Sequence, residues 1–518
     1  MRKTRVVLNG GPLSIADVHA VARMYAKVSL GDTARRAVNA AHEVVQKAAE
    51  GDEAVYGVNT GFGSLSRKRI AASDLRELQR NLVRSHAAGV GDPLPNVVVR
   101  AMMLILAGSL ARGMSGVRVE VIEQIIRMLN ADVTPVVPSR GSVGASGDLA
   151  PLAHVALVMI GEGTAEVPTR DDTWWEVVNA AEGLKRAKIK PIVLEAKEGL
   201  ALINGTHMMT AMAALLVHDA DSLMDAALTA GAMAIDACRA TDAFLDARLH
   251  KARNQPGQIE VAKRLRELLK GSEILPSHVE NDPRVQDPYS LRAMPQVMGA
   301  AMDAIGHVRG AVERELGAVT DNPLVFAGRA KGKGDIVSGG NFHGMPMAIS
   351  LDVLKIALCH VAGIAERRIF WILAASDSES HVPAYASPKP GLHSGYMIVQ
   401  YTAAALCNEL QTLCVPASVA NISTSAGMED YNSMGATSAH QAWRAMELAR
   451  NVVAAELLVM AEGLEYHRPL RSGKGVEKAH ERIRTNVARL TVDRPPGKDI
   501  RTIAWRIAGG VFMNDERK

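Results

Sequence analysis

The segment Asp132–Pro151, DVTPVVPSRGSVGASGDLAP, has the composition of a rigid loop that could do chemistry. Three glycines at a spacing of three (Gly141, Gly144 and Gly147) tighten the backbone before a helix expected to begin near Asp148. A glycine-rich turn at a helix N-terminus is one way to bind phosphate. The spacing does not match GxGxxG, however, and the GK[ST] ending of a P-loop is missing. On motif grounds a packing turn is therefore the simpler interpretation.

A third interpretation uses the chemistry of Ala145-Ser146-Gly147 itself. Small side chains let the backbone fold back, so that the amide nitrogen of Gly147 can attack the carbonyl carbon of Ala145. Loss of that oxygen as water, and of the Ser146 hydroxyl as a second water, leaves an imidazolone ring bearing a methylidene group. The product is an electrophile made from the chain, with no external cofactor, close to the positive end of the following helix.

The composition favours helices as the elements that position this loop. The chain has 518 residues, of which 48% are hydrophobic and only 4% aromatic, which favours a core of Ala, Leu, Val and Met packed between helices over a β-sandwich or barrel. A charged fraction of 22% is ordinary for a folded protein and excludes a disordered chain. A net charge of +4 is small for a chain of this length and does not indicate a surface that binds nucleic acid, so no nucleic-acid partner is expected.

Local patterns predict where these elements lie. Arg5–Gly10 is expected to form a strand and turn, and Ser14 with Asp17 to form a capping box at a helix start. Gly161–Leu194 is expected to be surface strand and loop, and Leu200–Leu245 one long helix, either straight or kinked. Further helices are expected near residues 34–49, from 73, across 97–129, and at 257–270, 293–317, 345–376, 393–414 and 435–463, with polar loops between them.

Several features bear on the compartment and on metals. The cysteines Cys238, Cys359, Cys407 and Cys414 form no CxxC pair, which favours free thiols in a reducing compartment. The basic N-terminus lacks an apolar signal region, and the uncharged stretch Gly199–Val217 carries too many polar residues for a membrane span. A cytoplasmic protein without membrane contact is expected. His360, His381 and His393 show no paired-ligand spacing, so no metal is expected.

Eight motifs, in order along nearly the whole chain, resemble the ammonia-lyases that use a methylidene-imidazolone prosthetic group, and the histidine ammonia-lyases most closely. They are YGVNTGFG (residues 56–63), NLVRSHAAGVG (81–91), GSVGASGDLAPLAH (141–154), NGT (204–206), VQDPYSLR (285–292), TDNP (320–323), GGNFHG (339–344) and MEDYNSMG (428–435). The resemblance implies a mainly α fold of the fumarase/aspartase-like type, with a mixed N-terminal part over residues 1–200 that bears the prosthetic loop and an elongated helical bundle over 201–518, the two forming one continuous unit. It also implies a homotetramer whose active sites draw loops from several chains.

The resemblance implies a role for each candidate residue. Ala145, Ser146 and Gly147 would form the prosthetic group, and Tyr56 would be the base that removes the β-hydrogen of the amino acid. A free tyrosine has a pKa of about 10, so the site must stabilise its phenolate. The remaining matches are Tyr289, which helps to orient the substrate, Arg292, which binds the carboxylate, Asn204, which supports the carboxylate and the imidazolone, and Gln286 and Phe342, which line the site.

Two residues bear on the choice of substrate. A histidine substrate needs polar partners for its imidazole, whereas phenylalanine needs apolar ones. His86 and Glu429 match the histidine and the glutamate that serve this purpose in histidine ammonia-lyases, and both favour L-histidine, giving urocanate and ammonia. Other positions depart from the pattern of histidine ammonia-lyases. Met428 replaces a polar residue, and Ala293 follows SLR. The segments NELQ (408–411) and NISTSA (421–426) also differ.

Three hypotheses follow from these observations. The first is elimination of ammonia from L-histidine. The second keeps the electrophile but has another substrate or outcome: a lyase or 2,3-aminomutase acting on tyrosine, phenylalanine or an analogue. The third is a catalytically silent helical scaffold, against which the intact Ser146 and Tyr56 argue.

Overall fold

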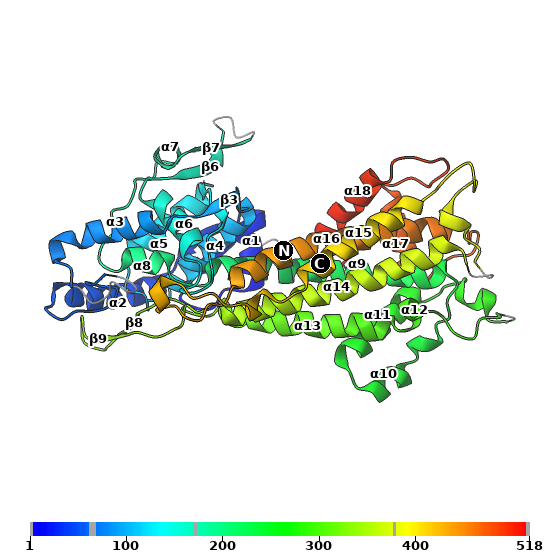
Figure 1. Ribbon diagram of the computed structural model, residues 1–518, viewed down its shortest axis with the longest axis horizontal. Helices are drawn as coiled ribbons and strands as arrows, with labels where there is room; N and C mark the ends of the chain where they lie inside the picture. The colour runs from blue at the N-terminus through cyan, green and yellow to red at the C-terminus, as the bar shows by residue number, and fades with distance from the viewer. Residues whose placement is uncertain (1–3, 62–68, 170–173, 281, 377–379, 514–518) are drawn as a thin grey trace. The chain divides into compact units, whose positions relative to one another are not determined.

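The computed structural model describes residues 4–61, 69–169, 174–280, 282–376 and 380–513, and it is mainly helical (Figure 1). Phe62 and Gly63 of the first motif lie outside the described residues. The chain forms two compact units, each made of segments that are distant in sequence. The first unit comprises 1–215, 309–351 and 416–440, and the second comprises 216–308, 352–415 and 441–518. The mainly α fold class expected from the sequence is confirmed, whereas the boundary near residue 200 stays a prediction.

The first unit begins as its sequence patterns predict. Strand β1 (Arg5–Leu8) pairs in parallel with β2 (Lys27–Leu30), and helix α1 (Ile15–Met24) lies between them in sequence. Ser14 and Asp17 form both halves of the predicted capping box. Helices α2 (Asp32–Glu50), α3 (Leu75–His86), α4 (Asn96–Leu110), α5 (Val119–Asn130) and α6 (Leu149–Met159) follow.

Small sheets and turns complete the first unit. Strands β4 (Thr134–Pro135), β6 (Thr164–Pro168) and β7 (Trp175–Asn179) form an antiparallel sheet in the order β4-β6-β7. Strand β3 (Val90–Pro93) pairs with β5 (Pro138–Arg140), and β8 (Leu324–Ala327) pairs with β9 (Gly334–Val337), both antiparallel. The expectation of strand and loop over 161–194 missed the short helix α7 (Ala180–Arg186).

Two stretches expected to be helical are interrupted. Within residues 97–129, Gly113 and Gly116 adopt φ values of +69° and +71° and separate α4 from α5. The expectation of one helix over Leu200–Leu245 is wrong, because α8 (Glu198–Ile203) ends before α9 (His207–Ala237) begins. Gly205, between them, has φ +137°, which is incompatible with a continuous helix. This break brings Asn204 to the site described below.

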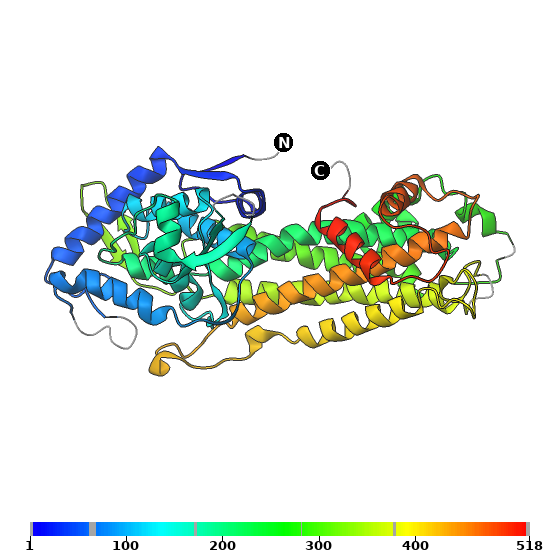
Figure 2. The same ribbon diagram turned by 90° about the horizontal axis from the view of Figure 1, so that it is seen from above.

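The second unit is a bundle of long helices that lie side by side (Figures 1 and 2). Its main elements are the C-terminal part of α9, most of α13 (Met294–Glu315), α14 (Met345–Ala374), α15 (Met397–Leu413) and α16 (Gly435–Glu465). Shorter helices are α10 (Ala247–Arg253), α11 (Pro256–Leu269), α12 (Tyr289–Arg292), α17 (Lys474–Arg484) and α18 (Gly497–Ala508).

Buried apolar side chains pack between these helices. Among the described residues, α14 is the one helix long and apolar enough to cross a membrane, and most of its apolar window is buried inside the protein. The four cysteines are free. In the described part of the chain, no cluster of three or more His, Cys, Asp or Glu residues is arranged to hold a metal ion.

Candidate active site

A cavity of about 720 Å³ in the first unit brings together six of the residues singled out in the sequence. They come from six separate segments, and further lining residues include Asn81, Ser85, Ser338, Ser425 and Met428. The six are Tyr56, His86, Ser146, Asn204, Phe342 and Glu429. The predicted prosthetic loop, the predicted base and the two predicted ring-reading residues therefore line one cavity.

The loop that carries Ser146 is compressed against the break between α8 and α9. Gly147 has φ +73°, and a Cβ there would lie 2.1 Å from the carbonyl of Gly205. The Gly205 amide donates to the Ser146 carbonyl at 3.1 Å, and the Asp148 amide donates to the Gly205 carbonyl at 2.7 Å. Ala145 is buried as well. A glycine at 147, a small residue at 145 and a tightly folded backbone are what closure of an imidazolone ring requires, so these residues fit that group.

Asp148 ties this loop to the start of α9, a role that the sequence analysis missed. Its Oδ2 accepts hydrogen bonds from the amides of Met208 and Met209 at 2.9 and 3.0 Å, and its Oδ1 accepts one from the Ser142 hydroxyl at 2.9 Å. Complete burial raises the pKa of Asp148 to about 6, although these hydrogen bonds oppose the shift. The carboxylate thus caps a helix that begins 59 residues later in the chain.

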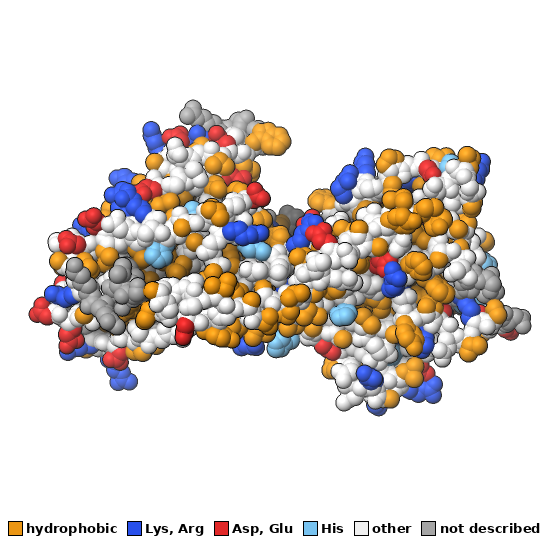
Figure 3. Space-filling view, viewed as in Figure 1, with side chains coloured by type: hydrophobic (Ala, Val, Ile, Leu, Met, Phe, Trp, Pro, Cys, Tyr) orange, Lys and Arg blue, Asp and Glu red, His pale blue; other side chains and the backbone are white. Residues whose placement is uncertain are grey.

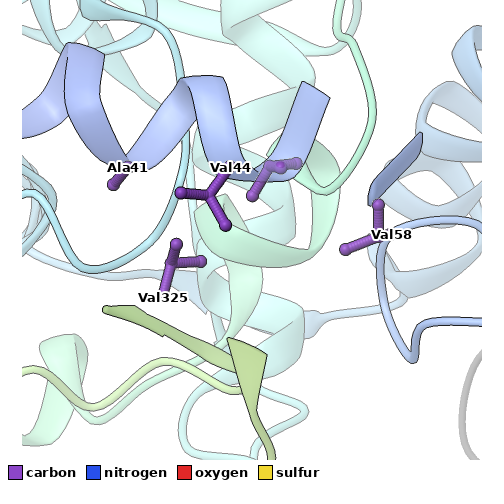
Figure 4. Packing of buried hydrophobic residues seen from close by; sticks show 5 residues of the cluster. Ala41, Val44, Val58 and Val325 are labelled. Atoms are coloured by element: carbon purple, nitrogen blue, oxygen red, sulfur yellow. The ribbon is translucent and has the colours of Figure 1, made fainter. Parts of the chain in front are cut away.

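The residues that follow Tyr56 hold its loop in place. Gly57 has φ +73°, and a Cβ there would lie 2.6 Å from the Leu200 side chain, so only glycine fits. Val58 is fully buried and belongs to a hydrophobic cluster that also contains Val44 of α2 and Val325 of β8 (Figure 4). The Asn59 side chain accepts from the Val55 amide at 2.7 Å and donates to the Glu53 carbonyl at 2.9 Å. Tyr56 itself is partly buried at the cavity wall.

A buried ion pair fixes Asn204. Lys197 Nζ lies 2.6 Å from Asp321 Oδ2, and both side chains are nearly inaccessible to solvent. Asn204 Nδ2 donates to Asp321 Oδ1 at 3.2 Å and to the Asn322 carbonyl at 3.1 Å. Neither Lys197 nor Asp321 was singled out in the sequence, although Asp321 lies in the TDNP motif. Beside them, burial lowers the pKa of His207 to about 4, so its imidazole is neutral.

The hydrogen bonds of His86 determine which ring nitrogen remains for a ligand. Its Nδ1 lies 2.9 Å from the Leu82 carbonyl, one turn earlier in α3. A carbonyl oxygen only accepts, so the tautomer that this contact favours has its hydrogen on Nδ1 and leaves Nε2 as an acceptor. A ligand with a ring N–H, such as an imidazole, suits this acceptor.

Glu429 contributes a second acceptor on the same cavity. Its Oε1 lies 3.4 Å from the Ser146 hydroxyl, and its Oε2 accepts a hydrogen bond from the Thr424 hydroxyl at 2.6 Å. The sequence analysis did not single out Thr424. Met428, the departure noted in the sequence, lines the cavity beside Glu429 and is 66% exposed.

The three remaining predicted residues belong to the second unit and are not among those lining this cavity. Gln286 and Tyr289 are exposed, Tyr289 by 72%. Arg292 stacks on the Tyr289 ring, with 4.5 Å between its guanidinium carbon and the ring centroid, and its Nε donates to the Asp287 carbonyl. The spacing of three positions on the short helix α12 places Tyr289 and Arg292 side by side.

Buried groups anchor the segment that carries these three residues. The Asp287 carboxylate accepts from the Thr241 amide at 2.9 Å, and Arg284 donates to the Cys238 carbonyl at 3.2 Å. Arg368, fully buried and paired with Glu456, donates to the Ser290 carbonyl at 3.3 Å. These contacts anchor the backbone of residues 284–292, whereas the Tyr289 side chain is exposed to solvent.

Comparisons with known proteins show the family to which the chain belongs. A family model described as aromatic amino acid lyase matches residues 13–485. The histidine ammonia-lyase of Anaeromyxobacter dehalogenans is 48% identical, with 98% of this chain and 99% of that protein covered. The solved histidine ammonia-lyase of Trypanosoma cruzi is 37% identical, with a TM-score of 0.89 and 99% and 96% of the two chains covered. The tyrosine aminomutase of Streptomyces globisporus is 34% identical, with a TM-score of 0.90 and 98% and 97% covered. The chain therefore belongs to the aromatic amino acid lyase family and is a carbon–nitrogen lyase.

Proposed function

We propose that this protein eliminates ammonia from L-histidine to give urocanate. The observation that carries the proposal is the pair of hydrogen-bond acceptors, His86 Nε2 and the Glu429 carboxylate, on a cavity that also contains Ser146. A neutral imidazole offers one ring N–H to such acceptors and an imidazolium offers two, whereas a phenyl ring offers none. The histidine ammonia-lyases that this chain resembles over nearly its whole length support the same substrate.

The prosthetic group of this reaction is a methylidene-imidazolone, which the family uses and which we propose forms here from Ala145, Ser146 and Gly147 with no external cofactor. The group supplies an electrophile that makes the substrate amine a better leaving group. The other residues of the chain hold the loop and bind the substrate. Its backbone around Gly147 and Gly205 holds the loop, and Asp148 anchors it to α9.

Tyr56 is the proposed base for the β-hydrogen. A phenol acts near neutral pH only if its phenolate is stabilised. Helix α6 begins at Leu149, close to Ser146, and Leu149 lines the same cavity. The positive end of the helix dipole therefore lies at this cavity. Asn204 lies there too, held by Lys197 and Asp321, and supports the substrate and the prosthetic group.

Gln286, Tyr289 and Arg292 act in a site that a second copy of the chain completes, within a homotetramer. Two observations support this part of the proposal. The segment that carries them is rigid but exposes Tyr289, and Arg292 suits a substrate carboxylate. Apolar side chains are also exposed on the bundle helices (Figure 3), among them Ile356 of α14 and Ile398 and Tyr401 of α15. Such faces are typical of subunit interfaces.

A second candidate function is a 2,3-aminomutase or a lyase for another aromatic amino acid. The observation that favours it is Met428, an unbranched apolar side chain on the cavity wall next to Glu429, where histidine ammonia-lyases have a polar residue. The similarity to a tyrosine aminomutase supports the same alternative.

Product stoichiometry separates the two candidates. The purified protein would be incubated with L-histidine, and ammonia and urocanate would be measured in the same sample. The proposed function predicts equal amounts of both. A β-amino acid formed without free ammonia would establish the aminomutase instead, and no reaction with L-histidine would contradict the proposal.

The two ring-reading residues give a sharper prediction. Replacing His86→Leu together with Glu429→Gln is expected to lower kcat/KM for L-histidine by about 100-fold or more, because each buried polar contact to the ring contributes roughly 1.5–3 kcal/mol. Any turnover of L-phenylalanine should change far less. Kinetics with both amino acids check this, and equal losses on both would mean that these residues do not read the ring.

A further inference from the structure

The turn that presents Glu429 to the cavity is built in an unusual conformation. Thr424 and Glu429 face each other as an antiparallel bridge, with backbone hydrogen bonds from Thr424 to Glu429 at 2.9 Å and from Glu429 to Thr424 at 3.3 Å. Between them Ser425, Ala426 and Gly427 all have positive φ, at +52°, +53° and +87°. Left-handed conformations are costly for residues with a Cβ, so other contacts must hold this turn.

The Thr424 hydroxyl is the side-chain contact that closes the turn. It donates to Glu429 Oε2 at 2.6 Å, and it accepts from Asn432 Nδ2 at 3.2 Å. Asn432 is itself fixed, because the same Nδ2 donates to the Ile422 carbonyl at 2.6 Å, and its side chain is buried. Since Asn432 donates to the hydroxyl oxygen, the single hydroxyl hydrogen of Thr424 is directed at the carboxylate.

This arrangement divides the two oxygens of Glu429 between different tasks. Oε2 is committed to Thr424, whereas Oε1 lies on the side of Ser146, 3.4 Å from its hydroxyl. Without the Thr424 hydroxyl, the carboxylate could rotate away from this orientation, which would weaken a fixed contact to a ligand. The short charge-assisted hydrogen bond opposes that rotation.

We infer that Thr424 is a positioning residue that sets the ring selectivity of the cavity by fixing the Glu429 carboxylate toward the substrate imidazole. The inference rests on the proposed function, in which Glu429 reads the ring. It deepens that function by adding a residue that does not touch the substrate and acts only through Glu429.

The test compares Thr424→Val, which keeps the shape of the side chain but removes the hydroxyl, with Thr424→Ser, which restores it. Thr412→Val is the matched control, because that exposed hydroxyl only donates to the Glu409 carbonyl within α15. The readouts are kcat and KM for L-histidine and the competitive inhibition constants of urocanate and trans-cinnamate. Thr424→Val is expected to raise KM for L-histidine and the inhibition constant of urocanate about tenfold, as expected for loss of one hydrogen bond to a charged group. Cinnamate inhibition should change by less than about twofold, and Thr424→Ser should recover most of the loss.

A double-mutant cycle separates positioning from general support of the turn. If Thr424 acts through Glu429, Thr424→Val should have little further effect on urocanate inhibition in a Glu429→Gln protein. The melting temperature and the mass of the Ala145–Gly147 peptide would show that each variant is folded and dehydrated. Equal weakening of urocanate and cinnamate, or additive losses in the cycle, would overturn the inference alone. A wild-type protein that does not turn over L-histidine would overturn the proposed function and the inference with it.

Discussion

Replacing Ser146→Ala is expected to abolish turnover of every amino acid substrate. The methylidene carbon of the proposed group comes from the Ser146 side chain, and alanine has no hydroxyl to lose. Mass spectrometry of the peptide that spans residues 145–147 should show the loss of two waters in the wild-type protein and not in the variant. Ser139→Ala, in the neighbouring strand β5 and outside the cavity lining, should keep both the mass loss and the activity.

The result that would contradict this part of the account is specific. Substantial turnover by the Ser146→Ala protein, or a wild-type peptide that retains both waters in an active preparation, would mean that the reaction does not use an electrophile made from this loop. A silent scaffold would also keep both waters, but it would show no activity.

Mixing two inactive variants is expected to restore activity. Tyr56 lines the cavity of the first unit, whereas Arg292 belongs to the second unit and is not among the lining residues. Tyr56→Phe removes the base and should lower kcat about 10²–10⁴-fold, and Arg292→Ala removes the carboxylate partner and should raise KM strongly. If different copies supply the two residues, about one quarter of the sites in randomly mixed tetramers contain both intact groups.

Co-expression of the two variants with different tags, followed by purification on both tags, gives the mixed oligomers. Activity on the order of a quarter of the wild-type value is the expected result, and the Tyr56→Phe/Arg292→Ala double variant alone serves as the inactive control. No recovery in verified mixed oligomers would mean that one chain supplies both residues, and the shared-site proposal would be wrong.

Local signals predicted local structure well. The Ser14–Asp17 capping box, the helix start at Leu149 after Asp148, and the helices at the positions of α11, α13, α14 and α16 follow from spacing and periodicity within a few residues. The break at Asn204–Thr206 could not be predicted in this way, because a single glycine within an otherwise helical pattern does not by itself end a helix. It is caused by the crossing of Gly205 with Gly147, a contact between residues far apart in the chain.

The candidate site likewise contains residues that the sequence could predict and residues that it could not. The motifs supplied candidate site residues, and six of them line one cavity in the structure. The side chains that orient them were missed, because Lys197, Asp321 and Thr424 are recognisable only from their partners: a buried ion pair over 124 positions in the first two, and a hydroxyl aimed at a carboxylate in the third. Their residue types alone are common on any surface.

The most direct test of the central claim is a side-by-side ultraviolet assay of the purified protein with L-histidine, L-tyrosine and L-phenylalanine. Elimination of ammonia from each would give a conjugated acid with its own absorbance. We predict strong formation of urocanate from L-histidine and little or no product from the other two, which would make Met428 a tolerated variation. Turnover of tyrosine or phenylalanine in preference to histidine would contradict the claim that His86 and Glu429 select an imidazole.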